Sequence, residues 1–163
     1  MDNLFVKTLL DVIHVLATVL WIGGMFINFI IIRPLTMKVL DPVTAGQFNM
    51  ALMKKFRIIV YASIVLLGVT GIPLKIVNPN YIDIINFENQ WEIVSFIKHL
   101  FYGLLVILAV FNFEIVSPNM ARAAAGKHQP QLLKWRQRAM ISGMLAMFSA
   151  IVILILSSMM RYL

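Results

Sequence analysis

The sequence contains no cysteine, and only 13% of its 163 residues are charged. Without cysteine the chain has no disulfide, no thiolate metal site, no covalently attached haem and no cysteine nucleophile. Acidic residues are few, seven against fourteen lysines and arginines, so the net charge is +7. Because the basic residues cluster beside long apolar segments, this charge indicates orientation in a membrane and no nucleic-acid partner.

Long apolar segments make up most of the chain, of which 61% is hydrophobic. Four segments reach the roughly 20 residues that are needed to cross about 30 Å of hydrocarbon. We therefore expect an all-α integral membrane protein, a four-helix transmembrane up-down bundle that forms one domain over residues 1–163 in contact with the lipid bilayer. The expected spans are residues 8–32, 57–76, 93–116 and 139–160.

The charges predict one orientation for this bundle. Ten of the fourteen basic residues belong to two connectors, between the first and second spans and between the third and fourth, when Arg57 at the first residue of the second span is included. The connector between the second and third spans instead carries Asp83, Glu88 and Glu92. The positive-inside rule then places both basic connectors in the cytoplasm and both termini on the non-cytoplasmic side of the inner (plasma) membrane.

Local signals mark some boundaries. Asp41 followed by Pro42 is typical of an N-cap with proline at the first helical position, which predicts that the second helix begins near residue 42. Residues 77–92 are expected to form an external loop, and residues 118–137 a second cytoplasmic connector. We find no convincing internal repeat.

Two histidines lie inside expected spans, where a polar side chain costs a few kcal/mol and tends to face the interior of a bundle. His14 comes seven residues after Lys7, and His99 seven residues after Glu92. On helices that start at the outer surface, both imidazoles lie about 10 Å below it. Two histidines at one depth are what bis-histidine ligation of haem b requires. The alternative is that each histidine hydrogen-bonds to a neighbouring helix.

The residues around the histidines complete the predicted cofactor site. Asp11 precedes His14 on the same face and is a candidate to orient it. Two lysines are candidates to pair with haem propionates or other acidic groups, although both can instead extend to the lipid headgroups. Small or aromatic residues on the same faces make room for a ring or pack against it. In addition to the two histidines, the set comprises Asp11, Trp21, Gly68, Gly71, Lys75, Lys98 and Tyr102.

Copper is the alternative metal, because the chain has eleven methionines and thioethers are suited to Cu(I). No closely spaced methionine series lines one helix in register with another, however, and methionine also fills gaps in membrane proteins. His128 is expected to be a solvated residue of a connector, and Glu114 lies near the cytoplasmic end of the third span.

Part of the first span resembles a known membrane domain. It contains His14, Trp21 seven residues later, the pair Gly23-Gly24, and a terminal Arg33-Pro34. This pattern resembles the opening helix of the copper-resistance D type of membrane domain. The stretch from Phe96-Ile97-Lys98 to Phe111-Asn112 and Pro118 is similar to the third helix of that family, with its lysine.

The same spacing of His14 and Trp21 also resembles the small four-helix bacterial protoporphyrinogen oxidase. That resemblance implies haem held by a first-helix histidine and a third-helix lysine, positions that His14 and Lys98 match. The sequence departs from the oxidase at residues 29–31, where Phe-Ile-Ile replaces a Leu-Pro-Arg turn. Lys98 and His99 are neighbours that point about 100° apart, so only one of them can be the third-helix ligand.

These features lead us to expect a b-type haem protein that transfers electrons near the outer membrane face, with His14 and His99 as axial ligands. One alternative is a membrane oxidoreductase that acts on a porphyrinogen or a quinone. Another is a copper transport or resistance protein, and a fourth is a cofactor-free subunit of a membrane complex. The expected partners are lipid together with a redox protein or quinone, and a homo-oligomer is compatible with the sequence.

Overall fold

A computed structural model describes residues 4–83, 85 and 87–163, and in this part of the chain all regular structure is helical. Four helical runs are long and apolar enough to cross a membrane, which confirms that prediction. Three expected spans lie wholly inside these runs, and the fourth extends one residue beyond its run. The runs are Leu4–Val39, Pro42–Ile76, Gln90–Ala125 and Gln129–Met159.

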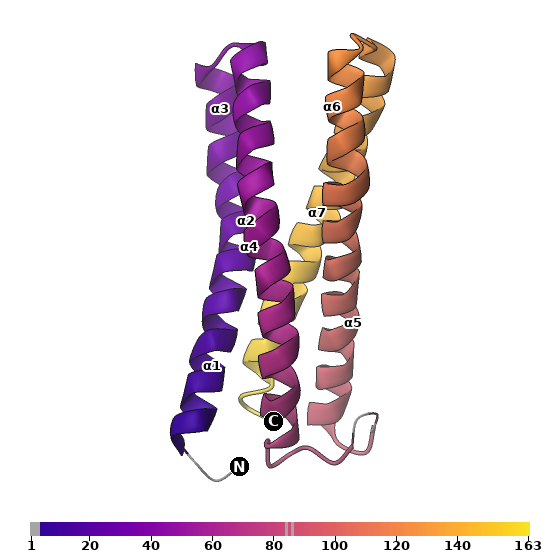
Figure 1. Cartoon of the computed structure of the whole chain (residues 1–163). Coiled ribbons are helices and arrows are strands. Elements are labelled where there is room, and N and C mark those ends of the chain that lie inside the picture. Colours follow the sequence, from indigo (N-terminus) through magenta and orange to yellow (C-terminus); the bar gives the residue numbers. More distant parts are fainter. Residues whose placement is uncertain (1–3, 84, 86) are drawn as a thin grey trace. The chain divides into compact units, whose positions relative to one another are not determined.

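The chain divides into two compact units, residues 1–81 and residues 82–163. Each unit is a helical hairpin. In hairpin 1, the run from α1 (Leu4–Thr18) to α3 (Arg33–Val39) packs against α4 (Pro42–Ile76) (Figure 1). In hairpin 2, α5 (Gln90–Val110) and α6 (Ser117–Ala125) pack against α7 (Gln129–Met159). The expectation of a single domain over residues 1–163 stays a prediction.

The first run of each hairpin contains π-helical turns. Hairpin 1 has η1 (Val19–Gly23) and η2 (Asn28–Ile32), separated by the short α2 (Gly24–Ile27). Hairpin 2 has η3 (Phe111–Val116) between α5 and α6. A proline follows η2 and η3 at the second residue beyond each. Because proline has no N–H and its ring clashes with the carbonyl four residues earlier, a wider π turn lets the helix continue through it.

The two π segments before proline share a sequence motif. Residues 28–34 and residues 112–118 both have asparagine and phenylalanine in the first two positions, isoleucine in the fourth and proline in the seventh. We expected no convincing repeat. The matching residues are few and lie in apolar sequence, and a π segment accompanies them in both hairpins. The two hairpins therefore share this short motif and the π segment that begins within it or one residue before it.

The start of α4 confirms the boundary expected from the Asp41-Pro42 pair. The Asp41 carboxylate accepts hydrogen bonds from the backbone N–H groups of Val43 at 3.0 Å and Thr44 at 3.1 Å. Hydrogen bonds from the side chain and the backbone of Thr44 hold the pKa of Asp41 below its ordinary value. An N-cap that satisfies first-turn N–H groups is what this pair predicts.

The connector expected at residues 118–137 is mostly helix. Only residues 126–128 separate α6 from α7, because Pro118 and Pro130 occupy first-turn positions that tolerate proline. The turn has the hydrogen bonds of a Schellman motif, from Lys127 N to Ala124 O at 3.2 Å and from His128 N to Ala123 O at 3.1 Å. Lys127 takes the left-handed position with φ 53°, where glycine is usual.

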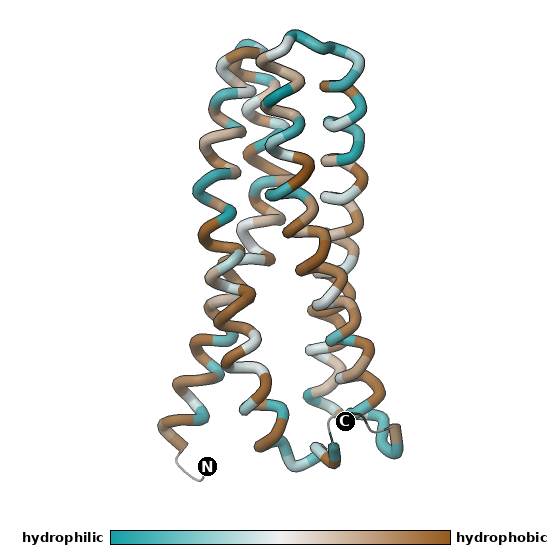
Figure 2. The backbone as a smooth tube through the Cα atoms, turned by 45° about the vertical axis from the view of Figure 1, so that its right-hand side comes forward, coloured by the Kyte–Doolittle hydropathy of each residue, from teal (hydrophilic) through white to brown (hydrophobic). Residues whose placement is uncertain are grey.

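Each hairpin is more hydrophilic at the end that carries its tight turn (Figure 2). The runs of 31 to 36 residues are longer than the roughly 20 residues that a bilayer core requires. Small side chains predominate where the helices meet, as is common in membrane helix packing. The buried ones include Ala17, Ser63 and Thr70 in hairpin 1, and Ser142, Ala146, Ser149 and Ala150 in hairpin 2.

Candidate functional site

His14 of α1 is held by Thr70 of α4, with 2.9 Å between His14 Nδ1 and Thr70 Oγ1. The buried Thr70 hydroxyl donates its only proton to the carbonyl oxygen of Leu66 at 2.6 Å. It must therefore accept the bond from His14, so Nδ1 carries the imidazole proton. This tautomer puts the lone pair on Nε2, the nitrogen that can coordinate a metal.

Gly71 and Gly68 of α4 differ in their relation to His14. A Cβ atom built at Gly71 would lie 3.2 Å from His14 Cε1 and 3.7 Å from Nδ1, whereas a Cβ at Gly68 meets nothing within 4 Å. Gly71 thus makes room for the imidazole, and Gly68 does not. Asp11, expected to orient His14, is exposed, and Thr70 is the Nδ1 partner. Trp21 is buried in η1.

His99 of α5 bonds to its own helix. Its Nδ1 donates to the backbone carbonyl oxygen of Ser95 at 2.6 Å, which fixes the same tautomer as in His14 because a carbonyl can only accept. The His99 side chain is exposed. The Ser95 hydroxyl is completely buried and, within the described residues, has no hydrogen-bond partner.

The remaining predicted residues lie on the same helices as the histidines. Lys98 and Tyr102 are half-buried on α5 beside His99. Lys75 lies in the last turn of α4, with Nζ 5.6 Å from the centre of the Tyr81 ring. This contact places the Lys75 cation against an aromatic face at the end of hairpin 1.

Glu92, which the charge pattern and the depth of His99 suggest lies at the outer surface, is a buried structural residue. Its side chain is 1% exposed, and Oε1 accepts a hydrogen bond from the backbone N–H of Ile82 at 3.1 Å. The backbone N–H of Glu92 is itself capped by the Asn89 side chain at 2.7 Å. The carboxylate thus ties residue 82 to the start of α5. An asparagine three residues before a glutamate is a helix-start signal that indicates this position.

The two motif asparagines both face a neighbouring helix. In hairpin 2, the Ser142 hydroxyl of α7 shares its proton between Arg138 O at 2.7 Å and Asn112 Oδ1 at 2.9 Å, and Asn112 Nδ2 donates to Leu108 O at 2.8 Å. In hairpin 1, Asn28 Nδ2 lies 3.8 Å from the Met53 sulfur of α4. Each asparagine therefore links its π segment to the second helix of its own hairpin.

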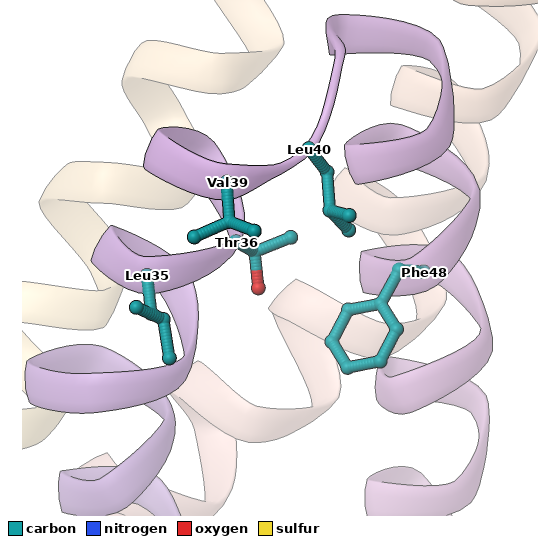
Figure 3. Close-up of a pocket in the computed structure, with 5 residues that line it drawn as sticks. All are labelled: Leu35, Thr36, Val39, Leu40 and Phe48. Carbon is teal, nitrogen blue, oxygen red and sulfur yellow. The ribbon is translucent and has the colours of Figure 1, made fainter.

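Two hollows lie among the described residues of hairpin 1. The smaller, about 220 Å³, lies at the turn between α3 and α4 (Figure 3). Its one polar residue, Thr36, donates its hydroxyl to Ile32 O, so this hollow offers no reactive group. The larger, about 400 Å³, lies between the two π segments and α4. It is lined by Val19, Leu20, Gly23, Gly24, Ile27, Asn28, Ile32, Leu52, Phe56 and Ile59.

Among the described residues, no three histidine, aspartate or glutamate side chains gather as a metal site would require. An axial pair of histidines on a porphyrin iron is not such a site, since the macrocycle supplies the other four nitrogens.

A family model described as Domain of unknown function (DUF4149) matches residues 16–129, more than half of the chain. The matched segment runs from α1 through α6 and includes His99 and both motif asparagines, and it begins just after His14. No curated protein and no solved structure matches the chain.

Proposed function

The chain belongs to this family of unknown function, and we propose that it is an integral membrane protein that binds haem b through His14 and His99. We further propose that it transfers electrons near the outer membrane face. A haem with two imidazole ligands would supply a one-electron carrier. The resemblance to the copper-resistance D type of membrane domain is part of this proposal.

The observation that carries the proposal is the tautomer of the two histidines. In each hairpin, Nδ1 donates to an acceptor of the protein, Thr70 Oγ1 for His14 and Ser95 O for His99. Metal-ligating histidines usually donate their other N–H to such a partner, which fixes the ring and raises the basicity of the ligating nitrogen. Both histidines lie on apolar helices with the proton on Nδ1 and the lone pair on Nε2, which supports ligation through Nε2.

The alternative to haem ligation is that each histidine only stabilises the helices by hydrogen bonding. The bond from His14 to Thr70 on the neighbouring helix is what a purely packing role for His14 predicts. The bond from His99 to its own carbonyl, on an exposed side chain, contributes little to packing between helices. Haem ligation accommodates both arrangements, and the spectra of the histidine variants separate it from the packing role.

The proposed topology is four spans in an up-down bundle with both termini on the non-cytoplasmic side. The four apolar runs and the basic residues near the turn-bearing end of each hairpin support it. Under this topology Lys75, at the far end of α4, lies near the outer face. Lys75 and Lys98 are the side chains we propose to pair with the haem carboxylates.

The visible spectrum of the full chain purified from membranes tests the proposal. We expect a b-type spectrum with a sharp Soret band, low-spin in both oxidation states. His14→Ala and His99→Ala should each lose the haem or convert it to a high-spin form. His128→Ala, a change at an exposed histidine outside the apolar spans, is the matched control and should leave the spectrum unchanged.

Two outcomes contradict the assignment. Protein that stays colourless after reconstitution with haem would overturn haem binding itself. If His99→Ala keeps the low-spin spectrum and Lys98→Ala destroys it, the third-helix ligand is the lysine. That result would favour the oxidoreductase alternative, which turnover of a porphyrinogen with a quinone acceptor would then test.

A further inference from the structure

The larger hollow of hairpin 1 is a groove built by the two π segments. Seven of its ten lining residues come from η1, α2 and η2, and three come from α4. Its volume of about 400 Å³ falls in the range of about 300–1,000 Å³ that is typical of small-molecule sites. Asn28 is the only polar side chain in the lining, so the groove suits a hydrocarbon chain.

Hairpin 2 provides an internal control for this groove. When the two asparagine-to-proline motifs are aligned, Gly23 and Gly24 correspond to Ile107 and Leu108. The segment that corresponds to η1 lies within α5, which runs as an uninterrupted α-helix from Gln90 to Val110. The shared π turn therefore belongs to the common fold. The glycine pair and η1, found at the groove, are particular to hairpin 1.

The two glycines shape the groove in different ways. A Cβ atom at Gly24 would lie 2.6 Å from Phe56 Cε2, so Gly24 allows the Phe56 ring of α4 to approach. A Cβ at Gly23 meets only Val19 Cγ1, at 4.0 Å. The space beside Gly23 is thus open, and a larger side chain there would occupy the groove without a clash at its own Cβ.

Positive charge borders the groove. Lys55 falls on the α4 face that lines it, three residues after Leu52 and four before Ile59. Arg33 directly follows the lining residue Ile32. Asp41 is the only acidic residue between Arg33 and Arg57, so no carboxylate in α4 up to Arg57 offsets these cations.

We infer that this groove binds one acyl chain of an anionic phospholipid, with the headgroup phosphate at Lys55. Arg33 adds a second cation near the same end. The inference rests on the membrane location in the proposed function but not on haem, so loss of the b-type spectrum would leave it standing. Moving an acyl chain from the bilayer into the groove changes its free energy little, because both surroundings are apolar. The charge of the headgroup therefore determines which lipid the groove prefers.

The first test measures lipid that remains bound to the full chain in mild detergent by native mass spectrometry, after addition of equal amounts of phosphatidylglycerol and phosphatidylethanolamine. We expect one retained phosphatidylglycerol. Gly23→Leu should lose it, because the added side chain fills the groove. Gly68→Leu is the matched control, since position 68 is open and lies outside the groove, and it should retain the lipid.

The second test changes charge alone and does not depend on how Gly23→Leu folds. Lys55→Gln should lower the preference for phosphatidylglycerol about fivefold, the effect expected of one basic residue at an anionic headgroup. Lys54→Gln is the control, because Lys54 lies on the opposite side of α4 and is also exposed. Equal retention of the two lipids by the wild type would overturn the inference, as would equal losses in Lys55→Gln and Lys54→Gln.

Discussion

Gly71 and Gly68 form a matched pair that tests how closely α4 packs against His14. Both lie in α4, and replacement by alanine changes helix propensity equally, by about 0.8–1.0 kcal/mol in favour of the helix. Only at Gly71 does the added methyl group meet another residue, His14 Cε1 at 3.2 Å. The difference in unfolding free energy between the two variants therefore isolates this contact.

The size of that difference follows from the geometry. Ordinary contact for a Cβ begins at 3.4 Å, so the imidazole must move by a few tenths of an ångström. That movement also disturbs the 2.9 Å bond from His14 Nδ1 to Thr70. Overpacking in a well-packed interior costs about 1–3 kcal/mol. We expect Gly71→Ala to be less stable than Gly68→Ala by this amount.

Equilibrium unfolding in mixed detergent micelles, followed by far-ultraviolet circular dichroism, measures the difference. If the two variants are equally stable, His14 does not pack against Gly71 as described. If haem is bound, Gly71→Ala should also broaden or shift the Soret band, and Gly68→Ala should not. A spectral change in Gly68→Ala alone would contradict the positioning of His14 by Gly71.

Three further predictions concern local interactions. Ser142→Ala should cost about 0.6–1.7 kcal/mol in the same unfolding measurement, because Asn112 Oδ1 loses a donor on the neighbouring helix. Lys127→Gly should stabilise the protein by about 1–2 kcal/mol by relieving a left-handed residue, whereas Lys127→Ala should not. The pKa of Asp41 is lowered in the fold, so its cap is fully present above its unfolded pKa and is lost as the pH falls through the folded pKa. Amide exchange of the first turn of α4 should therefore speed up in acid relative to a chain with Asp41→Asn, which caps without titrating.

The number of helices could be predicted because it depends on the length of apolar runs. The start of α4 could be predicted because the bonds from Asp41 to Val43 and Thr44 are local in sequence. The connector at residues 118–137 could not, because the positive-inside rule predicts on which side residues lie and not whether they are helical. The alanine-rich helix α6 continues there with its one basic residue, Arg122, exposed.

The partner of His14 could not be predicted from its own helix. Asp11 was the expected partner because it shares a helical face with His14, but Thr70 lies on another helix and only the packing of the hairpin brings it to Nδ1. Ser95, by contrast, precedes His99 by one helical turn on the same helix. A hydrogen-bond partner within the same helix can be predicted from sequence spacing. A partner on the other helix of a hairpin depends on how the two helices are aligned along their length.

Comparison of the two hairpins distinguishes residues that both hairpins share from residues that differ between them. The motif asparagines and prolines recur in both, with π turns and links to the second helix, so they serve the fold. In the same alignment Lys98 occupies the position of His14, and His99 is the next residue. The alignment thus places a polar residue at the equivalent position of each hairpin's first helical run. If His99 is the haem ligand, it lies one residue beyond the position that corresponds to His14. If Lys98 is the ligand, it occupies that position itself. The spectra of His99→Ala and Lys98→Ala thus identify the ligand of hairpin 2 and show whether it occupies the position that corresponds to His14.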